Sequence, residues 1–185
     1  MTFLELVRKR RSVRNYARTP VPRKIIDRCL EAARLAPSAC NSQPWTFIVL
    51  DDRELIAACA DKVFSGIYSM NSFVTNAPAL IVVITERSRY SAVLGGYLRG
   101  TQYSLIDIGI ACEHLVLQAA EEGLGTCWIG WFNETRMKEL LGLPRSARID
   151  VVISVGYPSE HAAGSQKRKS LDQVRRYHPA QGSAP

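Results

Sequence analysis

The chain has 185 residues, of which 46% are hydrophobic and 22% are charged, and its formal net charge is +7. These values are ordinary for one globular domain with its own core, and no stretch approaches the ~20 consecutive apolar residues of a membrane-spanning helix. The N-terminal residues carry charges from Glu5 onward, which argues against a signal peptide. We therefore expect a soluble, cytoplasmic protein with a single domain over residues 1–185.

The N-terminal part of the chain predicts two helices separated by an extended segment. Thr2 and Glu5 fit a capping box that opens a short helix. The basic run at 8–16 has no helical period and is expected to be extended. A second, amphipathic helix follows Pro22, with apolar residues at helical spacing, and Pro37 ends this pattern.

Two apolar runs in the next part of the chain predict strands. The segment 37–45 reads "PSACNSQPW" and is unusually rich in hydrogen-bonding groups for a connection. It leads into an apolar run at 45–50, expected as a buried strand, and a helix is expected over 53–62. Residues 79–85, "ALIVVIT", form the clearest strand pattern, and the polar segment 86–103 is expected to be an exposed excursion.

The longest helix is predicted over residues 104–123. Gly123 is a natural residue to end it, and Gly109 inside it suggests close packing, because glycine costs a helix about 1 kcal/mol relative to alanine. The predicted core-facing stripe consists of Leu105, Ile108, Cys112, Leu115, Val116, Ala119 and Ala120.

Two further strands and a short helix complete the pattern. Strands are expected at 126–132 and 149–158, with a helix at 134–141 between them. The tail at about 176–185 is expected to be extended or disordered. Four strands interleaved with helices indicate an α/β or α+β domain of several layers.

Familiar catalytic motifs are missing from the chain. The glycines at 123, 125 and 130 follow a helix and precede a strand, which is the reverse of the order in a dinucleotide-binding fingerprint. His114 has no second histidine four residues away, and the five cysteines show no metal-binding or disulfide spacing, so no metal is expected. If the chain is an enzyme, a cofactor is therefore expected to carry the reactive group.

Positive charge lies at both ends of the chain. Residues 1–34 hold ten Lys/Arg against three acids and residues 166–185 hold five against one, whereas the middle of the chain is net acidic. In an extended segment Arg10, Ser12 and Arg14 would point to one face and could clamp a phosphate. A solvated basic run or a nucleic-acid surface would give the same charge pattern, although few aromatic residues are interleaved with these charges.

The chain resembles the nitroreductase family of homodimeric, FMN-dependent oxidoreductases over nearly its whole length. This resemblance implies an α+β domain of three layers, with a central mixed but mainly antiparallel sheet flanked by helices, in an intertwined homodimer of the short, minimal form. The segments that carry it are "RRSVRNY", "PSACNSQPW", "NAPALIVV", "DIGIACEHLVLQAAEEGLGTCWIGWF", "LGLP", "ISVGYP" and "KRKSLDQV".

The resemblance also implies the residues that bind the cofactor. The segment 37–45 would be a loop at the dimer interface that reaches the FMN held mainly by the other subunit. Arg10 and Ser12 would hold the FMN phosphate and ribityl oxygens, Arg14 would lie near the N1–O2 edge and tune the flavin, and the backbone at Gly130 would approach N5 and O4. The implied contacts are Arg10, Arg11, Ser12, Arg14, Pro37, Ser38, Ala39, Asn41, Asn71, Ile129, Gly130, Trp131, Lys167 and Arg168.

The activity implied by the resemblance is ping-pong hydride transfer. NADH or NADPH would reduce the flavin at N5 and leave, and a nitroaromatic, quinone or related acceptor would then take its place. Such chemistry needs no protein nucleophile, which agrees with the missing catalytic motifs. The alternatives are another activity of the family, such as free-flavin reduction or reductive dehalogenation, and a flavin-binding carrier or redox sensor without turnover.

Overall fold

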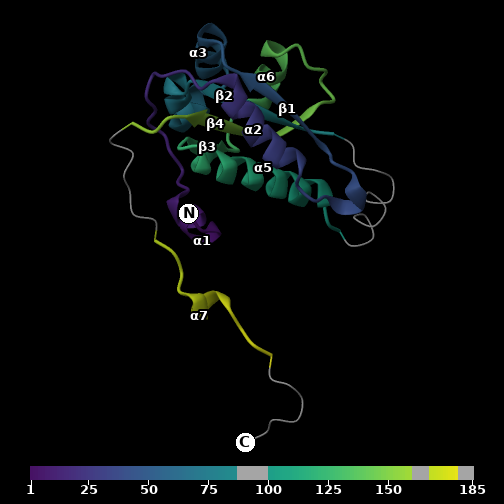
Figure 1. Ribbon diagram of the computed structural model, residues 1–185. Helices are drawn as coiled ribbons and strands as arrows, with labels where there is room; N and C mark the ends of the chain where they lie inside the picture. Colours follow the sequence, from purple (N-terminus) through teal and green to yellow (C-terminus); the bar gives the residue numbers. More distant parts are fainter. Residues whose placement is uncertain (87–99, 160–166, 179–185) are drawn as a thin grey trace, which may run out of the picture.

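The computed structural model describes residues 1–86, 100–159 and 167–178. They form an α+β arrangement of three layers, in which helices cover both faces of one sheet (Figure 1). The strands lie in the order β1 (Trp45–Leu50), β2 (Ala79–Thr85), β4 (Arg148–Gly156) and β3 (Gly125–Ile129), each antiparallel to its neighbour. A mixed sheet was expected. Among the described residues, the parallel pairing consists of one isolated bridge, between Ser12 and Thr126.

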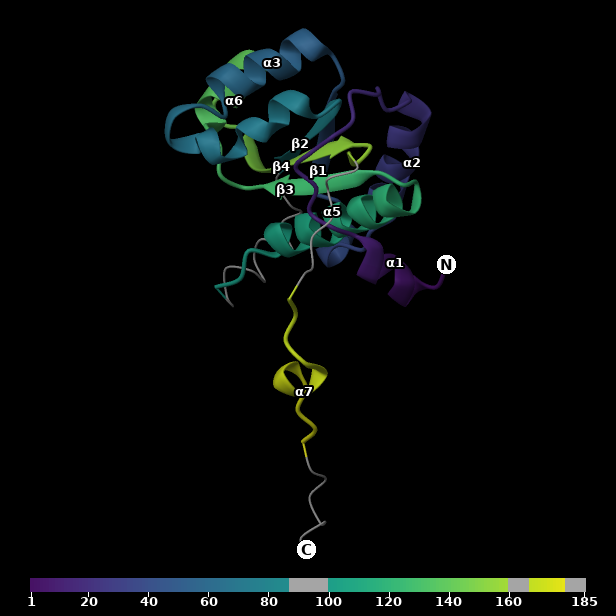
Figure 2. The same ribbon diagram turned by 90° about the vertical axis from the view of Figure 1, so that its left-hand side faces the viewer.

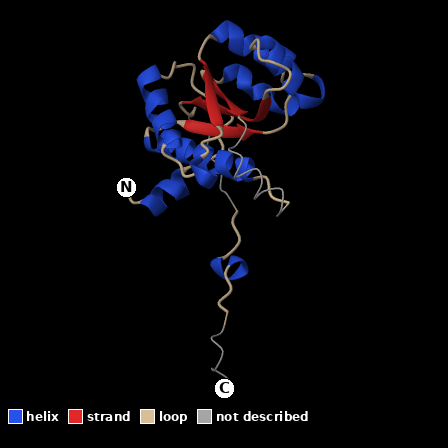
Figure 3. Cartoon of the chain, turned by 90° about the vertical axis from the view of Figure 1, so that its right-hand side faces the viewer, coloured by secondary structure: helices blue, strands red, loops and turns tan. Residues whose placement is uncertain are grey.

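Helices from separate parts of the chain form the two outer layers. On one face, α2 (Arg23–Arg34) packs against α5 (Tyr103–Glu121), and both cover the sheet. The opposite face carries α3 (Arg53–Lys62), the 3₁₀ segment η2 (Gly66–Asn76) and α6 (Glu134–Leu140), as Figures 2 and 3 show. The sheet therefore contributes side chains to two hydrophobic cores, one on each face.

Strand β2 lies in the interior of the sheet and supplies both cores. Its side chains alternate between the faces, as the pleat of a strand requires. Ile81 and Val83 pack into the core with α2 and α5, whereas Leu80 and Val82 pack into the opposite core. All four side chains are fully buried, which confirms the buried strand predicted over 79–85.

Three of the four strand predictions differ from the structure in burial or in length, and one of them, the strand predicted over 149–158, is β4 at Arg148–Gly156, which ends two residues earlier. Strand β1 has the predicted bounds, but it lies at the edge of the sheet, and of its six residues only Leu50 is fully buried. The strand predicted over 126–132 ends at Ile129, where pairing with β4 stops. Gly130 and the two residues after it lie outside the sheet.

The long helix has the expected bounds to within two residues, and Gly123 follows it with φ of +78°, the left-handed conformation that favours glycine. Leu105, predicted to face the core, is 40% exposed instead. The close packing expected at Gly109 is also absent among the described residues, since a Cβ built there would meet nothing within 4 Å. This side of α5 therefore faces away from the core of the chain.

The two ends of the chain leave the three layers. The capping box of Thr2 and Glu5 opens α1 (Phe3–Lys9) as predicted, and the extended segment starts at Arg10 rather than at residue 8. Helix α7 (Leu171–Val174) lies away from the layers in all three views (Figures 1–3). Of the predicted excursion at 86–103, residues 87–99 lie outside the described residues, as do residues 179–185 of the predicted tail.

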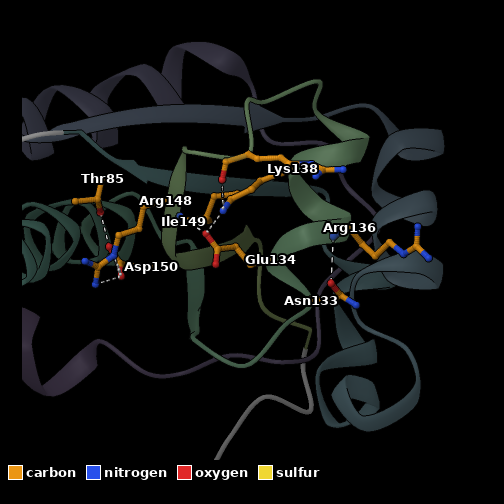
Figure 4. Close-up of polar contacts among 9 residues, drawn as sticks. Thr85, Asn133, Glu134, Arg136, Lys138, Arg148, Ile149 and Asp150 are labelled. Atoms are coloured by element: carbon orange, nitrogen blue, oxygen red, sulfur yellow. Dashed lines mark hydrogen bonds and ion pairs between the residues drawn. The ribbon is translucent and has the colours of Figure 1, made fainter.

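A polar cluster fixes α6 to the sheet (Figure 4). Glu134 accepts a hydrogen bond from the backbone N–H of Ile149 at 3.0 Å and pairs with Lys138 at 2.7 Å. Although partial burial tends to raise the pKa of Glu134, these hydrogen bonds outweigh it and lower the pKa below its usual range. The helix therefore has a defined position on β4, and with it the segment that connects β3 to α6.

No helix among the described residues is both long and apolar enough to cross a membrane.

Candidate functional site

The residues 10–14, called the cationic segment below, lie along strand β3. The backbone N–H of Val13 donates to the carbonyl of Thr126 at 2.8 Å, next to the bridge between Ser12 and Thr126. The approach is close because Gly125 has no side chain, and a Cβ there would lie 2.6 Å from Cγ2 of Val13. These contacts, between residues far apart in the sequence, place the predicted phosphate clamp of Arg10, Ser12 and Arg14 beside β3.

A buried tyrosine just beyond this segment fixes its position at Val13. The Tyr16 hydroxyl donates to the carbonyl of Val13 at 2.6 Å and lies 2.7 Å from Oγ of Ser154. Burial raises the pKa of Tyr16 well above its usual range, although the hydrogen bond with Ser154 acts in the opposite direction. Because Val13 and Tyr16 are both buried, Arg14 between them is turned outward and exposed.

A cavity of about 130 Å³ lies between the cationic segment and the end of α5. Partial burial raises the pKa of Glu113 on α5, and the nearby charge of Arg10 lowers this pKa in part. Three cationic residues, 9–11, and the residues at the C-terminal end of α5 lie around this one cavity. The residues that line it are Lys9, Arg10, Arg11, Val13, Ala120, Gly123, Leu124, Gly125, Thr126 and Pro158.

The residues after β3 are held by η2. Asn71 donates through Nδ2 to the carbonyl of Trp131 at 2.8 Å, and Trp131 Nε1 donates to the carbonyl of Ile67 at 3.1 Å. The Trp131 ring lies 5.2 Å from that of Tyr68, centre to centre, and is 53% exposed. A Cβ added at Gly130 would meet nothing within 4 Å, so the backbone there is open to approach.

Segment η2 also connects this region to the cationic segment. The guanidinium of Arg14 lies over the ring of Phe73, with Cζ 5.9 Å from the ring centre. Asn71, on the same segment, contacts Trp131 as described above. The structure therefore brings together the predicted residues of the cationic segment, Asn71, and the backbone at 129–131.

The residues 37–43, called the Pro37 loop below, form a second group elsewhere in the chain. Their centre is the short 3₁₀ segment η1 (Ala39–Asn41). The backbone N–H of Ala39 donates to Oδ1 of Asp107 at 3.0 Å, which ties the loop to the first turns of α5. Cys40 is exposed in this loop and has a left-handed backbone.

The two groups lie at opposite ends of α5. Asp107 holds the Pro37 loop, whereas Ala120 lines the cavity beside the cationic segment. At 1.5 Å per residue these two positions of one helix are roughly 20 Å apart. Lys167 and Arg168 belong to the described segment 167–178, which Figure 1 shows leading away from the three layers through α7. One chain alone therefore does not assemble all the predicted site residues.

Asp107 and Phe73 were not among the predicted site residues. Asp107 is 3% exposed, and its Oδ2 is buried with no hydrogen-bond partner among the described residues. Its position was visible in the sequence, because Asp107, Ala111 and Leu115 recur every four residues and lie on one face of a helix. No sequence signal pointed to Phe73, since its contact with Arg14 joins segments that the fold brings together.

These residues fit a phosphorylated flavin when tested by their chemistry. Guanidinium groups at Arg10, Arg11 and Arg14 with a hydroxyl at Ser12 suit a phosphate dianion and polar oxygens beside it. The open backbone at Gly130 would let a flat ring come close. The exposed Trp131 adds apolar surface at the same place.

Comparison with known proteins gives matches over most of the chain. Residues 7–157 match the nitroreductase family. A protein of Archaeoglobus fulgidus, provisionally named NADH dehydrogenase/NAD(P)H nitroreductase, is 37% identical over 163 residues, covering 85% of this chain and 86% of that protein. Iodotyrosine deiodinase 1 of Rattus norvegicus is 31% identical over 195 residues, covering 93% of this chain and 68% of that protein. The structure of an FMN-dependent nitroreductase from Clostridium difficile R20291 is 28% identical with a TM-score of 0.69, covering 98% and 99% of the two chains.

Proposed function

This chain belongs to the nitroreductase family, and we propose that it works as a homodimer in which NAD(P)H reduces a nitroaromatic, quinone or related acceptor through bound FMN. The family match and the relatives named for NAD(P)H and FMN support an NAD(P)H-dependent flavin oxidoreductase. We further propose that residues 1–185 act as one domain, since the family match spans 7–157 without interruption.

The observation that carries the homodimer is the separation of the two groups of site residues. The Pro37 loop and the cationic segment lie at opposite ends of α5, so neither can complete the other's site within one chain. A second copy can supply a Pro37 loop to the cationic segment of the first. This arrangement would form two equivalent sites, as a symmetric dimer requires.

Exposed apolar side chains support the same assembly. Leu105 and Ile106 are exposed on α5, next to the open Gly109, and Phe3 and Leu4 are exposed on α1. Exposed pairs of large apolar side chains such as these are typical of an interface with another protein. The apolar residues of α7 and Tyr177 are exposed too, and we propose that this segment brings Lys167 and Arg168 to the same phosphate.

The proposed roles of the chain's own residues follow from their chemistry. Bound FMN would supply the transfer of electrons from NAD(P)H to the acceptor, in ping-pong order. Arg10, Arg11 and Ser12 would bind its phosphate and ribityl oxygens. Arg14 would place a positive charge where the reduced ring becomes negative, and so favour reduction. The backbone at Ile129, Gly130 and Trp131 would line the ring.

Reductive dehalogenation is a second candidate activity, favoured by the similarity to iodotyrosine deiodinase 1. The two candidates differ only in the acceptor, because both need a reduced flavin at the same binding residues. Consumption of an aryl iodide, with release of iodide, by the anaerobically reduced protein would select this activity, whereas reduction of nitroaromatics or quinones alone would select the first.

The first experiment is a visible absorbance spectrum of the purified protein, repeated anaerobically after addition of NADH or NADPH. We expect flavin bands that bleach, and sedimentation of the protein as a dimer. Bands that persist with both nucleotides would point instead to a carrier or redox sensor. A protein that neither contains flavin nor takes it up from added FMN would contradict the proposal.

A further inference from the structure

The Pro37 loop has a strained backbone. Cys40, Asn41 and Gln43 have φ of +53°, +51° and +46°, in the left-handed region that residues other than glycine rarely adopt. The strain is smallest for asparagine, whose short polar side chain tolerates this region. Strained backbone persists only where surrounding contacts hold it in place. The loop therefore depends on its hydrogen bonds for its shape.

Most of the loop's hydrogen bonds are internal. The backbone N–H of Gln43 donates to Oγ of Ser38 at 2.9 Å, and that of Asn41 donates to the carbonyl of Ser38 at 3.0 Å. The N–H of Ser42 donates to the carbonyl of Ala39, also at 3.0 Å. These bonds hold the curve of the loop but do not set its orientation relative to the rest of the protein.

One hydrogen bond of the loop reaches a distant element. Among the described hydrogen bonds of residues 38–43, only that from the N–H of Ala39 to Oδ1 of Asp107 ends on another helix or strand beyond β1. Asp107 is buried on α5, and its other carboxylate oxygen has no hydrogen-bond partner among the described residues. Burying a carboxyl group with so few hydrogen-bond donors is unfavourable. The presence of Asp107 at this buried position of α5 therefore needs a specific reason.

We propose that Asp107 is a positioning residue for the flavin site: it holds the amide of Ala39 and thereby sets the orientation in which Ser38 and Asn41 are presented to the flavin. This inference rests on the proposed function, because it takes the flavin as the group that the Pro37 loop contacts. It adds a residue that does not itself touch the cofactor. An alternative reason for an acid in the first turns of α5 is its favourable interaction with the helix dipole. That interaction does not require a hydrogen bond to Ala39.

The test compares three variants. Asp107→Ala removes the acceptor, and Asp107→Asn keeps an oxygen that can accept from Ala39. Ala39→Pro removes the donor instead, and it suits the backbone because Ser38 before it is extended, with φ of −145° and ψ of 155°. Leu115→Ala is the matched control, since it weakens the packing of the same helix in the core, away from the loop.

We expect FMN to bind about tenfold more weakly or worse to Asp107→Ala and to Ala39→Pro, as loss of a hydrogen bond to a charged group implies. Asp107→Asn and Leu115→Ala are expected to stay within about threefold of the wild type. The double variant Asp107→Ala/Ala39→Pro should bind no worse than either single variant, because both remove one hydrogen bond. Binding unchanged in Asp107→Ala, or equally weak in Asp107→Asn, would overturn the proposal.

Hydrogen exchange of the Ala39 amide gives a readout that needs no flavin. In the flavin-free protein we expect this amide to be protected in the wild type and in Asp107→Asn, and to exchange faster in Asp107→Ala. Equal exchange in all three would refute the role of Asp107 even if FMN binds. If the wild-type protein fails to bind FMN although the Ala39 amide is protected as expected, the proposed function is refuted. The hydrogen bond from Ala39 to Asp107 would still stand.

Discussion

The guanidinium of Arg14 lies over the ring of Phe73, 5.9 Å from Cζ to the ring centre. The ring supports a side chain that is otherwise exposed, between the buried Val13 and Tyr16. In an exposed position such a contact is worth about 0.5–1 kcal/mol, enough to favour one direction of the side chain. The contact thus orients the positive charge that we propose for the flavin ring.

Replacement of Arg14 should therefore affect the flavin more than the fold. Arg14→Ala is expected to unfold at nearly the wild-type temperature but to hold a flavin of lower reduction potential, by about 30 mV for each 1.4 kcal/mol of lost stabilisation. Reduction by NAD(P)H should slow accordingly. Arg14→Lys, which keeps the charge, is the control, and a potential unchanged in Arg14→Ala would rule out this role.

Replacement of two glycines near the site by alanine should affect different properties, the stability in one case and FMN binding in the other. Gly125→Ala places a Cβ 2.6 Å from Val13 and should lower the free energy of unfolding by about 1–3 kcal/mol. Gly130→Ala meets nothing within 4 Å and should leave stability unchanged while weakening FMN binding. Denaturant titration and FMN titration of both variants separate the effects. Equal stabilities would show that the cationic segment does not depend on Gly125.

The Tyr16 hydroxyl should contribute measurably to stability. Tyr16→Phe leaves the buried Ser154 without its 2.7 Å partner, and we expect a loss of about 1–3 kcal/mol in the free energy of unfolding. In a double-mutant cycle, Ser154→Ala should cost less in the Tyr16→Phe background than in the wild type. Additive losses would mean that the two hydroxyls do not interact.

Acid should weaken the attachment of α6 to β4. The pKa of Glu134 is lowered in the folded protein, mainly because Lys138 and the N–H of Ile149 outweigh the effect of its burial. Its contribution to stability is therefore complete above the pKa of an unfolded glutamate, about 4.3, and is lost as the pH falls through the lower folded value. Thermal unfolding between pH 7 and pH 3 should show a steeper acid loss in the wild type than in Glu134→Gln.

The apolar side of α5 should be needed for the dimer. Ile106 is 50% exposed, so Ile106→Glu should leave the folded monomer intact but shift the protein to monomers and reduce FMN binding. Ala57→Glu, on the exposed side of α3, is the matched control. Sedimentation of both variants measures the outcome. A dimer that persists in Ile106→Glu with FMN bound would exclude this side of α5 from the interface.

Local pattern was sufficient for most of the secondary structure. The bounds of β1, β2 and α3 were predicted from apolar periodicity, because these runs are bordered by residues such as Asp51 and Asp52 that end or cap an element. The resemblance to a known family supplied the three-layer fold and the residues of the site.

The sequence by itself thus determined most of the helices and strands, although not η2 or α7, and it marked Arg10, Ser12 and Arg14 as a candidate clamp. Only the tertiary structure decided that β1 lies at an edge, that β3 ends at Ile129, and that Asp107 holds Ala39. The physical reason is the range of the interactions. Capping and periodicity act over a few residues, whereas strand pairing and the burial of a carboxylate against a distant amide depend on which segments the fold brings into contact.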